Sequence, residues 1–340
     1  MNNRTISVCI PSYNRSQYLR EVLDSVVSQS DLHEVVICED RSPEQAAIRQ
    51  IVCEYQEKYP GLIVYHENKV NLGFDGNIRQ LLRVATGDYC LFLGNDDLLA
   101  DGAVHAISVA IASNPGCGVL LRAYGWFEGD ASNMTGCVRY FKEGVTLSPG
   151  PAAMRFGYRR SCVLAGLTVL RKPTLDFECT DFDGTLYYQM YVVGRLLVDH
   201  SCVYVPDLIA LCRADERPQF GNAAAERGEF TPGEYTVKAR LKMMAGMVKI
   251  ARHLDLYSPQ VSHALLGDIA NYSLPWISYH ADKPFPVFFN YYRGLSRLGL
   301  GRYPMFHIYF ALVTVFGKSC LDALVLRLRR VLGATPRLKI

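Results

Sequence analysis

The sequence lacks several features that would assign it to a specialised class of protein. It has no CxxC pair among its eleven cysteines, and it has no excess of one charge, since 36 lysines and arginines face 33 aspartates and glutamates. Nucleic-acid binders concentrate basic residues on one face, so this near balance argues against nucleic acid as a partner. Cysteines scattered singly through apolar runs behave as small hydrophobic residues, which argues against a disulfide-stabilised secreted fold.

Long apolar runs are also absent. No uninterrupted run reaches the roughly 20 residues that a membrane-spanning helix needs, and the first residues contain no apolar stretch of the signal-peptide kind. We therefore expect a cytoplasmic chain with free thiols. The 340 residues are 49% apolar and 20% charged, which excludes wholesale disorder. At about 100–200 residues per domain, this length predicts two domains, or one large domain with an appendage.

The first hundred residues alternate between strand and helix patterns. Leu19, Val22, Leu23 and Val26, for example, recur at the spacing of one buried helix face. Such alternation predicts right-handed strand–helix–strand units and an α/β fold, with a mostly parallel sheet flanked by helices. The predicted strands are Thr5–Ile10, Glu34–Cys38, Leu62–His66 and Tyr89–Leu93.

The pattern is less regular from residue 118 to 213 and becomes helical beyond residue 233. We predict strands at Val119–Arg122, Val163–Leu170 and Val203–Val205, a helix at Leu186–Leu197, and a linker or mobile loop at Arg213–Gly233. Further helices are predicted at roughly 233–254, 258–280, 285–298 and 303–331. This division predicts an α/β domain over residues 1–215 and a helical region over residues 216–340.

Polar side chains follow the predicted strands at their carboxyl ends, where ligands bind in parallel α/β sheets. Asp40 follows the second strand, and Asp96 and Asp97 follow the fourth. Two adjacent acids at the end of a buried strand are costly unless a cation offsets them, and Mg²⁺ or Mn²⁺ takes such oxygen ligands together with substrate phosphates. The alternative is that Asp97 or Asp101 caps a helix beginning near Ala103, and that Asp40 is a turn residue.

Four of these segments resemble, in order, the motifs of family 2 glycosyltransferases with the GT-A fold. Ser7–Arg15 resembles the family's opening strand and turn, Val35–Ser42 its acidic second-strand motif, and Asn71-Leu72-Gly73 with Asn77 its N-x-G loop and following Asn. Gly87–Asp97 resembles the strand that ends in the metal-binding DxD signature. The resemblance covers roughly residues 4–115, weakens to about residue 213, and does not reach the C-terminal third.

The resemblance implies roles for individual residues. Asp40 would bind the base of a sugar nucleotide, and Asp96, with Asp97, would hold Mg²⁺ or Mn²⁺ on its diphosphate. The other residues expected at the nucleotide sugar are Pro11, Ser12, Tyr13, Asn14, Glu39, Asn71, Gly73, Asn77, Asn95 and Arg213. The chain departs from the DxD pattern, because Gly94 stands at the first acid and Asn95 at the middle position. Such a variant is similar to transferases that add deoxy- or dideoxyhexoses to bacterial O-antigen units.

Transfer of a sugar also needs a carboxylate that accepts the proton of the acceptor hydroxyl. Asp181 and Asp183 lie where the family carries its acidic base motif, although its usual Glu-Asp-Trp spelling is absent. Their alternative role is to stabilise the start of the following helix through its dipole. Arg213 would either bind the diphosphate or lie exposed on the surface.

The C-terminal region suggests contact with a membrane surface. Met305–Phe316 is apolar but too short to span a bilayer, and six basic residues face one acid between Lys318 and Ile340. An apolar stretch beside a cationic flank suits an interfacial anchor on anionic lipid, and a buried helix with a solvated basic face is the alternative.

The expected function is therefore an inverting, metal-dependent glycosyltransferase of bacterial surface polysaccharide or O-antigen (lipopolysaccharide) synthesis. Its acceptor would be a glycan linked to polyprenyl diphosphate, on the cytoplasmic face of the inner membrane. The alternatives are a catalytically inactive sugar-nucleotide-binding or membrane scaffold protein, and a nucleotidyltransferase. The last would carry a glycine-rich phosphate loop near the N-terminus, and Pro11–Arg15 contains no glycine.

Overall fold

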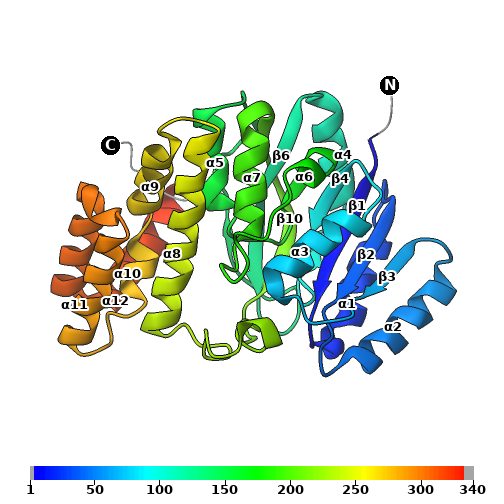
Figure 1. Ribbon diagram of the computed structural model, residues 1–340, viewed down its shortest axis with the longest axis horizontal. Coiled ribbons are helices and arrows are strands. Elements are labelled where there is room, and N and C mark those ends of the chain that lie inside the picture. Colours follow the sequence, from blue (N-terminus) through cyan, green and yellow to red (C-terminus); the bar gives the residue numbers. More distant parts are fainter. Residues whose placement is uncertain (1–3, 333–340) are drawn as a thin grey trace.

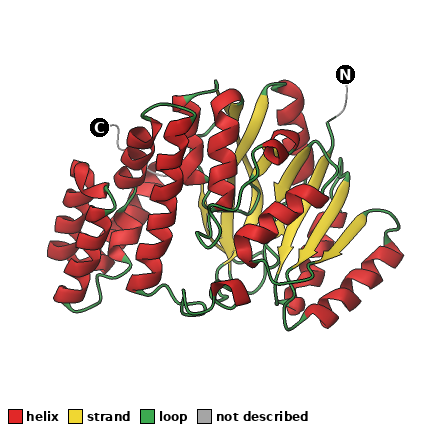
Figure 2. Ribbon diagram, viewed as in Figure 1, coloured by secondary structure: helices red, strands yellow, loops and turns green. Residues whose placement is uncertain are grey.

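In the computed structural model, which describes residues 4–332, ten strands form one mixed sheet (Figures 1 and 2). The strand order is β3-β2-β1-β4-β9-β6-β10-β5, with β7 beside β6 and β8 beside β10. The strands are β1 (Ile6–Ser12), β2 (Glu34–Glu39), β3 (Ile63–Glu67), β4 (Tyr89–Phe92), β5 (Leu98–Leu99), β6 (Cys117–Phe127), β7 (Met134–Val138), β8 (Val145–Leu147), β9 (Thr168–Leu170) and β10 (Ser201–Arg213).

The predicted parallel half of the sheet is confirmed. β3, β2, β1 and β4 pair in parallel, and β6 and β10 form a second parallel pair. Only β9 separates these two groups, and it runs antiparallel to both β4 and β6. The carboxyl ends of β1, β2 and β4 therefore meet at one edge of the sheet, the lower edge in Figure 1.

Helices cover both faces of the sheet, and a group of helices lies beyond its end (Figures 1 and 2). In Figure 1, α3 and α7 lie in front of the sheet and α8–α12 form the end opposite β3. The helices are α1 (Ser16–Val27), α2 (Gln45–Lys58), α3 (Gly73–Val84), α4 (Ala103–Ser113), α5 (Pro151–Arg160), α6 (Lys172–Asp176), α7 (Tyr188–Asp199), α8 (Val237–His253), α9 (Val261–Asn271), α10 (Leu274–Ser278), α11 (Phe285–Arg297) and α12 (Pro304–Leu332).

Several predicted elements were wrong in extent. The helix predicted over 258–280 is broken into α9 and α10, because Pro275 lacks the N–H that a helix interior requires. The strand predicted at Val163–Leu170 is limited to Thr168–Leu170, since Gly166 takes a left-handed turn with φ of 78° just before it. Helix α5, which begins at Pro151, was not predicted.

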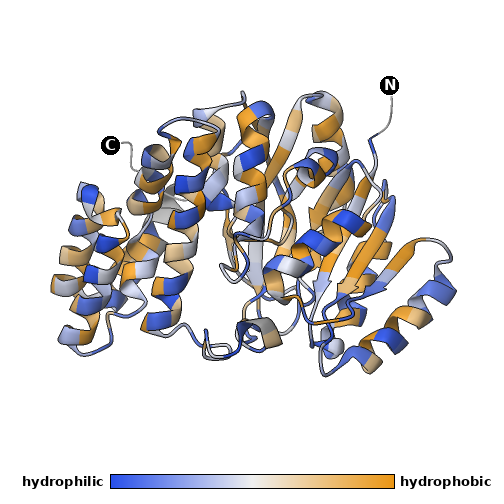
Figure 3. Cartoon of the chain, viewed as in Figure 1, coloured by the Kyte–Doolittle hydropathy of each residue, from blue (hydrophilic) through white to orange (hydrophobic). Residues whose placement is uncertain are grey.

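The apolar core continues from the sheet into the helical region. One cluster of buried side chains runs from Ile6 in β1 through Met244 in α8 to Val313 in α12, and Figure 3 shows apolar residues along the central strands and on the helix faces beside them. The boundary at residue 215 stays a prediction. All eleven cysteines are free thiols, as expected.

Helix α12 corrects the expectation that no segment is long enough to span a membrane. By length and composition alone, the 22 residues Pro304–Val325 meet that criterion, with only 17% of the most apolar window buried. The helix is interrupted, however, because Gly317 has non-helical angles (φ 73°, ψ 163°). Residues 304–316 are about 20 Å long at 1.5 Å per residue, which is short of a hydrocarbon core of about 30 Å.

Candidate active site

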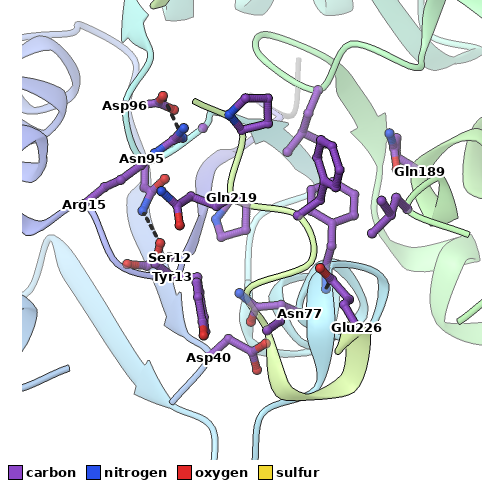
Figure 4. Close-up of a pocket in the computed structure, with 18 of the residues that line it drawn as sticks. Ser12, Tyr13, Arg15, Asp40, Asn77, Asn95, Asp96, Gln189, Gln219 and Glu226 are labelled. Carbon is purple, nitrogen blue, oxygen red and sulfur yellow. Dashed lines mark hydrogen bonds and ion pairs between the residues drawn. The ribbon is translucent and has the colours of Figure 1, made fainter. Parts of the chain in front are cut away.

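A cavity of about 370 Å³ opens at the carboxyl edge of β1, β2 and β4 (Figure 4). Asp40 and Asp96, which lie 56 positions apart in the chain, both line it. Figure 4 shows Asp96, Asn95 and Arg15 along one side of the cavity and Gln189 on the opposite side. The lining residues are Pro11, Ser12, Tyr13, Arg15, Asp40, Phe74, Asn77, Gly94, Asn95, Asp96, Asp97, Cys162, Leu164, Leu186, Tyr187, Gln189, Pro218, Gln219, Phe220, Ala223, Glu226, Tyr235 and Met243.

Asp40 is held by four hydrogen-bond donors. The side-chain amides of Asn68 and Asn71 and the backbone N–H groups of Leu72 and Gly73 all donate to its carboxylate, over 2.8–3.0 Å. The carboxylate is nevertheless only 2% exposed, and this burial raises its pKa to about 6 despite the donors. Asp40 is therefore a rigid acceptor in the pocket wall, and the turn-residue alternative is not supported.

The loop after β3 explains how that carboxylate is oriented. Gly73 has a left-handed φ of 72°, which turns its N–H toward Asp40 at the start of α3. Asn77, one turn later, donates to the Cys38 carbonyl and accepts a bond from Asn68. Asn77 lines the pocket, whereas Asn71 and Gly73 contact Asp40 rather than the cavity.

Asp96 and Asp97 lie side by side in the pocket wall. Asp96 forms an ion pair with Arg15 (Nη1 to Oδ2, 2.6 Å), and Asp97 accepts a backbone bond from Arg213. Burial raises the pKa of both carboxyls, and the neighbouring Asp96 raises that of Asp97 further. The capping alternative fails, because α4 begins after Gly102 without a side-chain cap.

Gly94 is required by the crowding of these two carboxylates. A Cβ atom at this position would lie 2.5 Å from Asp97 Oδ2 and 3.4 Å from Asp96 Oδ1. The first acid of the DxD pattern therefore has no space here, because the carboxylate of Asp97 occupies it.

The segment from Ala214 to Thr236, which we call the pocket loop, folds across the cavity, where a linker or mobile loop was predicted at Arg213–Gly233. Tyr13 donates to the Asn222 carbonyl, and Arg15 donates to the Arg217 carbonyl. Glu226 accepts bonds from the backbone N–H groups of Phe74 and Gly221, which ties the loop to the start of α3. In Figure 1 this loop runs along the lower edge of the molecule between β10 and α8.

Other predicted residues do not reach the cavity. Asp183 is ion-paired through both oxygens with Arg79, Asp181 is exposed, and neither lines the cavity. Glu39 accepts bonds from the backbone N–H groups of Arg41 and Ser42.

Arg213 and Asn14 also lie outside the cavity lining. The Arg213 guanidinium is not exposed, because it pairs with Glu21 and stacks on Tyr18 and Phe127. Asn14 supports the wall through its carbonyl, which accepts a bond from Asn95.

Four residues were missed by sequence reasoning. Arg15 was visible in the first motif but received no role, and Gln189 lies inside a helix pattern that gave no sign of a pocket. Glu226 lies in a segment read as a linker. Asp75 holds the start of α7 by accepting from the N–H groups of Leu186 and Tyr188, a role considered only for Asp181 and Asp183.

Residues 7–157 match the family model for glycosyl transferase family 2. The family motifs that the sequence resembles lie on β1, β2, β4 and the start of α3, around one cavity.

Two relatives are similar to part of this chain. The chain is 34% identical over 109 residues to abequosyltransferase RfbV of Salmonella typhimurium, which is 32% of this chain and 33% of that protein. It is 36% identical over 109 residues to the minor teichoic acid biosynthesis protein GgaB of Bacillus subtilis, which is 31% of this chain and 12% of that protein. The matched segment thus spans a third or less of these relatives' own length.

Solved structures extend the similarity of fold to the whole chain. TarS of S. aureus in complex with UDP-GlcNAc aligns over 99% of this chain and 94% of its own, with a TM-score of 0.61 and 17% identity. Mannosyltransferase PcManGT of Pyrobaculum calidifontis, in complex with GDP-Man and Mn²⁺, aligns over 97% and 88%, with a TM-score of 0.53 and 15% identity. At such identities the likeness shows the fold alone, which is the expected GT-A-like arrangement.

Proposed function

We propose that this protein transfers a sugar from a nucleotide-sugar donor to a glycan acceptor during the synthesis of a bacterial surface polysaccharide of the O-antigen type. The observation that carries the proposal is the meeting of Asp40 and Asp96 in one cavity. These two residues come from the two motifs that the family resemblance assigns to the nucleoside and to the diphosphate. The relatives RfbV, an abequosyltransferase, and GgaB, a minor teichoic acid biosynthesis protein, support sugar transfer in the synthesis of such a polymer.

The donor would lie along the wall formed by β1, β2 and β4. Asp40 accepts a hydrogen bond from the base, beside the ring of Tyr13, and the diphosphate lies next to Asp96. The transferred sugar then faces the far wall, where Tyr187, Tyr235 and Leu186 offer apolar and aromatic surface.

The donor set of this wall fits a divalent cation. Magnesium is commonly held by one or two carboxylates plus substrate phosphates. Asp96 and Asp97 supply two adjacent pocket carboxylates, and burial together with the charge of Asp96 raises the pKa of Asp97. Among residues 4–332, no group of three or more acidic, histidine or cysteine side chains forms a complete protein cage. Asp96 and Asp97 would hold the ion together with the donor, and the ion would supply Lewis-acid stabilisation of the leaving diphosphate.

The proposed reaction forms one bond, breaks another and transfers one proton. The acceptor hydroxyl oxygen bonds to the anomeric carbon as the bond from that carbon to the phosphate oxygen breaks, with inversion, and the bonding electrons leave with the diphosphate. The hydroxyl proton passes to a base. Asp181 and Asp183 were both predicted for this task, and Asp183 can act only after its carboxylate has left Arg79 and turned toward the cavity.

We further propose that the acceptor is carried by a polyprenyl diphosphate and that α11 and α12 contact the cytoplasmic face of the inner membrane. Large apolar side chains are exposed on these two helices: Phe285, Val287, Phe289, Ile308, Val315, Phe316 and Leu324. Lys318 and Arg327 are exposed nearby on α12, which suits an anionic surface. Arg337 and Lys339, which were part of the predicted basic flank, lie outside the described residues.

A donor screen tests the proposal. The purified protein is incubated with Mn²⁺ and a panel of nucleotide sugars, with and without a polyprenyl-linked acceptor, and donor binding and product are measured separately. We expect one donor to bind and to yield product only with the acceptor, and Asp96→Ala to abolish transfer while the protein stays folded. Binding without product under every condition would favour the scaffold alternative, and full activity of Asp96→Ala would remove Asp96 from the mechanism.

A further inference from the structure

Arg15 is the single basic residue among the described residues that line the cavity. All four acidic lining residues, namely Asp40, Asp96, Asp97 and Glu226, would repel a donor whose diphosphate is negatively charged. Because charged hydrogen-bond donors are the strong partners of phosphate oxygens, Arg15 is the side chain of this wall with the right charge.

One N–H donor of the Arg15 guanidinium has no hydrogen-bond partner. Its Nη1 lies 2.6 Å from Asp96 Oδ2, and its Nη2 donates to the Arg217 carbonyl of the pocket loop. Its Nε is buried and has no hydrogen-bond partner, although a guanidinium has five N–H donors that suit phosphate oxygens. A buried donor without a partner is destabilising, so the Arg15 guanidinium has unused hydrogen-bonding capacity in the absence of a ligand.

The backbone is strained in a way that aims this side chain into the cavity. Asn14 and Arg15 are consecutive non-glycine residues with left-handed φ angles of 55° and 65°. Such residues are energetically unfavourable and persist where the surroundings enforce them. Asn95 enforces them here, because its side-chain amide donates to the carbonyl of Asn14. Asn95 thus fixes the turn that places Arg15 over the neighbouring Asp96.

We propose that Arg15 binds the diphosphate of the donor and stabilises the leaving group, with Asp96 as the counter-ion that keeps its guanidinium in place before the donor arrives. The inference rests on the proposed function and adds a ligand for the phosphates that belongs to the protein itself. As the bond from the anomeric carbon to the phosphate oxygen breaks, the electron pair moves to the diphosphate, and Arg15 donates hydrogen bonds to that growing charge. Arg15 itself gains and loses no proton.

This role makes part of the diphosphate affinity independent of a metal ion. We expect the wild-type protein to bind UDP or GDP in EDTA more tightly than the corresponding nucleoside. Arg15→Gln should weaken binding of the diphosphate by about ten- to a hundredfold, the fold-change that one or two charged hydrogen bonds give, and should leave nucleoside binding unchanged. Arg15→Lys should restore part of the loss, because it keeps the charge without the fork of donors.

The decisive experiment is a double-mutant cycle of Arg15→Gln and Asp96→Asn, followed by titration calorimetry with UDP, GDP, uridine and guanosine in EDTA. Arg20→Gln is the matched control, because Arg20 lies on the following helix and pairs with Glu54 away from the cavity. If Arg15 binds phosphate, the double variant has a much lower diphosphate affinity than Asp96→Asn alone.

Two results would overturn the inference. Equal diphosphate affinities of Asp96→Asn and of the double variant would reduce Arg15 to a neutraliser of Asp96, and the proposed transfer would stand. A wild-type protein that binds none of these nucleotides or their sugars, with or without Mn²⁺, would overturn both the inference and the proposed function. Thermal unfolding of each variant establishes that it is folded under the conditions of the binding assay.

Discussion

Asp40 should make stability and donor binding respond to pH in opposite directions. Its pKa in the folded protein is raised to about 6 by burial, whereas an aspartate in an unfolded chain has a pKa near 4. Between these values the folded protein keeps a proton that the unfolded chain has released. The stabilisation from this group is therefore fully present below about pH 4 and is lost as the pH rises to about 6.

The expected size follows from the shift. About two pKa units correspond to about 3 kcal/mol of unfolding free energy, and the carboxylate is too buried for solvent screening to reduce this much. Donor binding has the opposite slope, because only the ionised carboxylate accepts freely from the base of a nucleotide. Affinity for the nucleoside should therefore rise as the pH passes through about 6.

The assay is urea unfolding at pH 4.5 to 7.5 of the wild type and of Asp40→Asn, in parallel with binding of uridine and guanosine. Asp75, Asp97 and Glu226 also have raised pKa values, but they are present in both proteins, so the difference between the two stability curves isolates Asp40. We expect this difference to change by about 2 kcal/mol across the range, because part of the roughly 3 kcal/mol is already lost by pH 4.5. Parallel curves would refute the reasoning, because they would mean that Asp40 ionises in the folded protein as it does in the unfolded chain.

Three further predictions concern the rest of the site and the C-terminal helices. Gly94→Ala should destabilise the protein by about 1–3 kcal/mol, since its Cβ would lie 2.5 Å from Asp97 Oδ2. The control is Gly116→Ala, whose Cβ has no neighbour within 4 Å. Equal unfolding free energies of the two variants would contradict the crowding. Asp183→Asn should lower transfer less than about tenfold, because its carboxylate is engaged by Arg79; a loss of about 100-fold or more at unchanged donor affinity would identify it as the base. The double variant Val315→Asp, Phe316→Asp should no longer bind anionic vesicles in a flotation assay, since both residues are exposed on α12. Val109→Asp on α4 is the control. Unchanged flotation of the double variant would show that α12 does not contact the membrane.

The candidate site was predictable from the sequence where a motif lies at the end of a strand. The acids after β2 and β4 had to meet, because parallel strands bring their carboxyl ends to one edge of a sheet. Asp40 and Asp96 could therefore be paired across 56 positions from the strand pattern alone.

Residues whose role depends on the approach of distant segments could not be assigned in this way. Glu226 lies in a polar stretch that reads as a linker, and it lines the cavity only because two backbone N–H groups, from α3 and from its own loop, hold its carboxylate. Asp183 matched a family position, but the partner that engages it, Arg79, is 104 residues away.

The sequence by itself determined the alternating order of strands and helices and the acidic edge of the sheet, because hydrophobic periodicity and the direction of parallel strands are local properties of a chain. Only the tertiary structure decided which charges face the cavity. It placed Arg15 over Asp96, turned Arg213 away toward Glu21, and used Asp97 to fill the space beside Gly94. Ion pairs and close packing depend on the approach of side chains from separate elements, and no spacing along the chain encodes that approach.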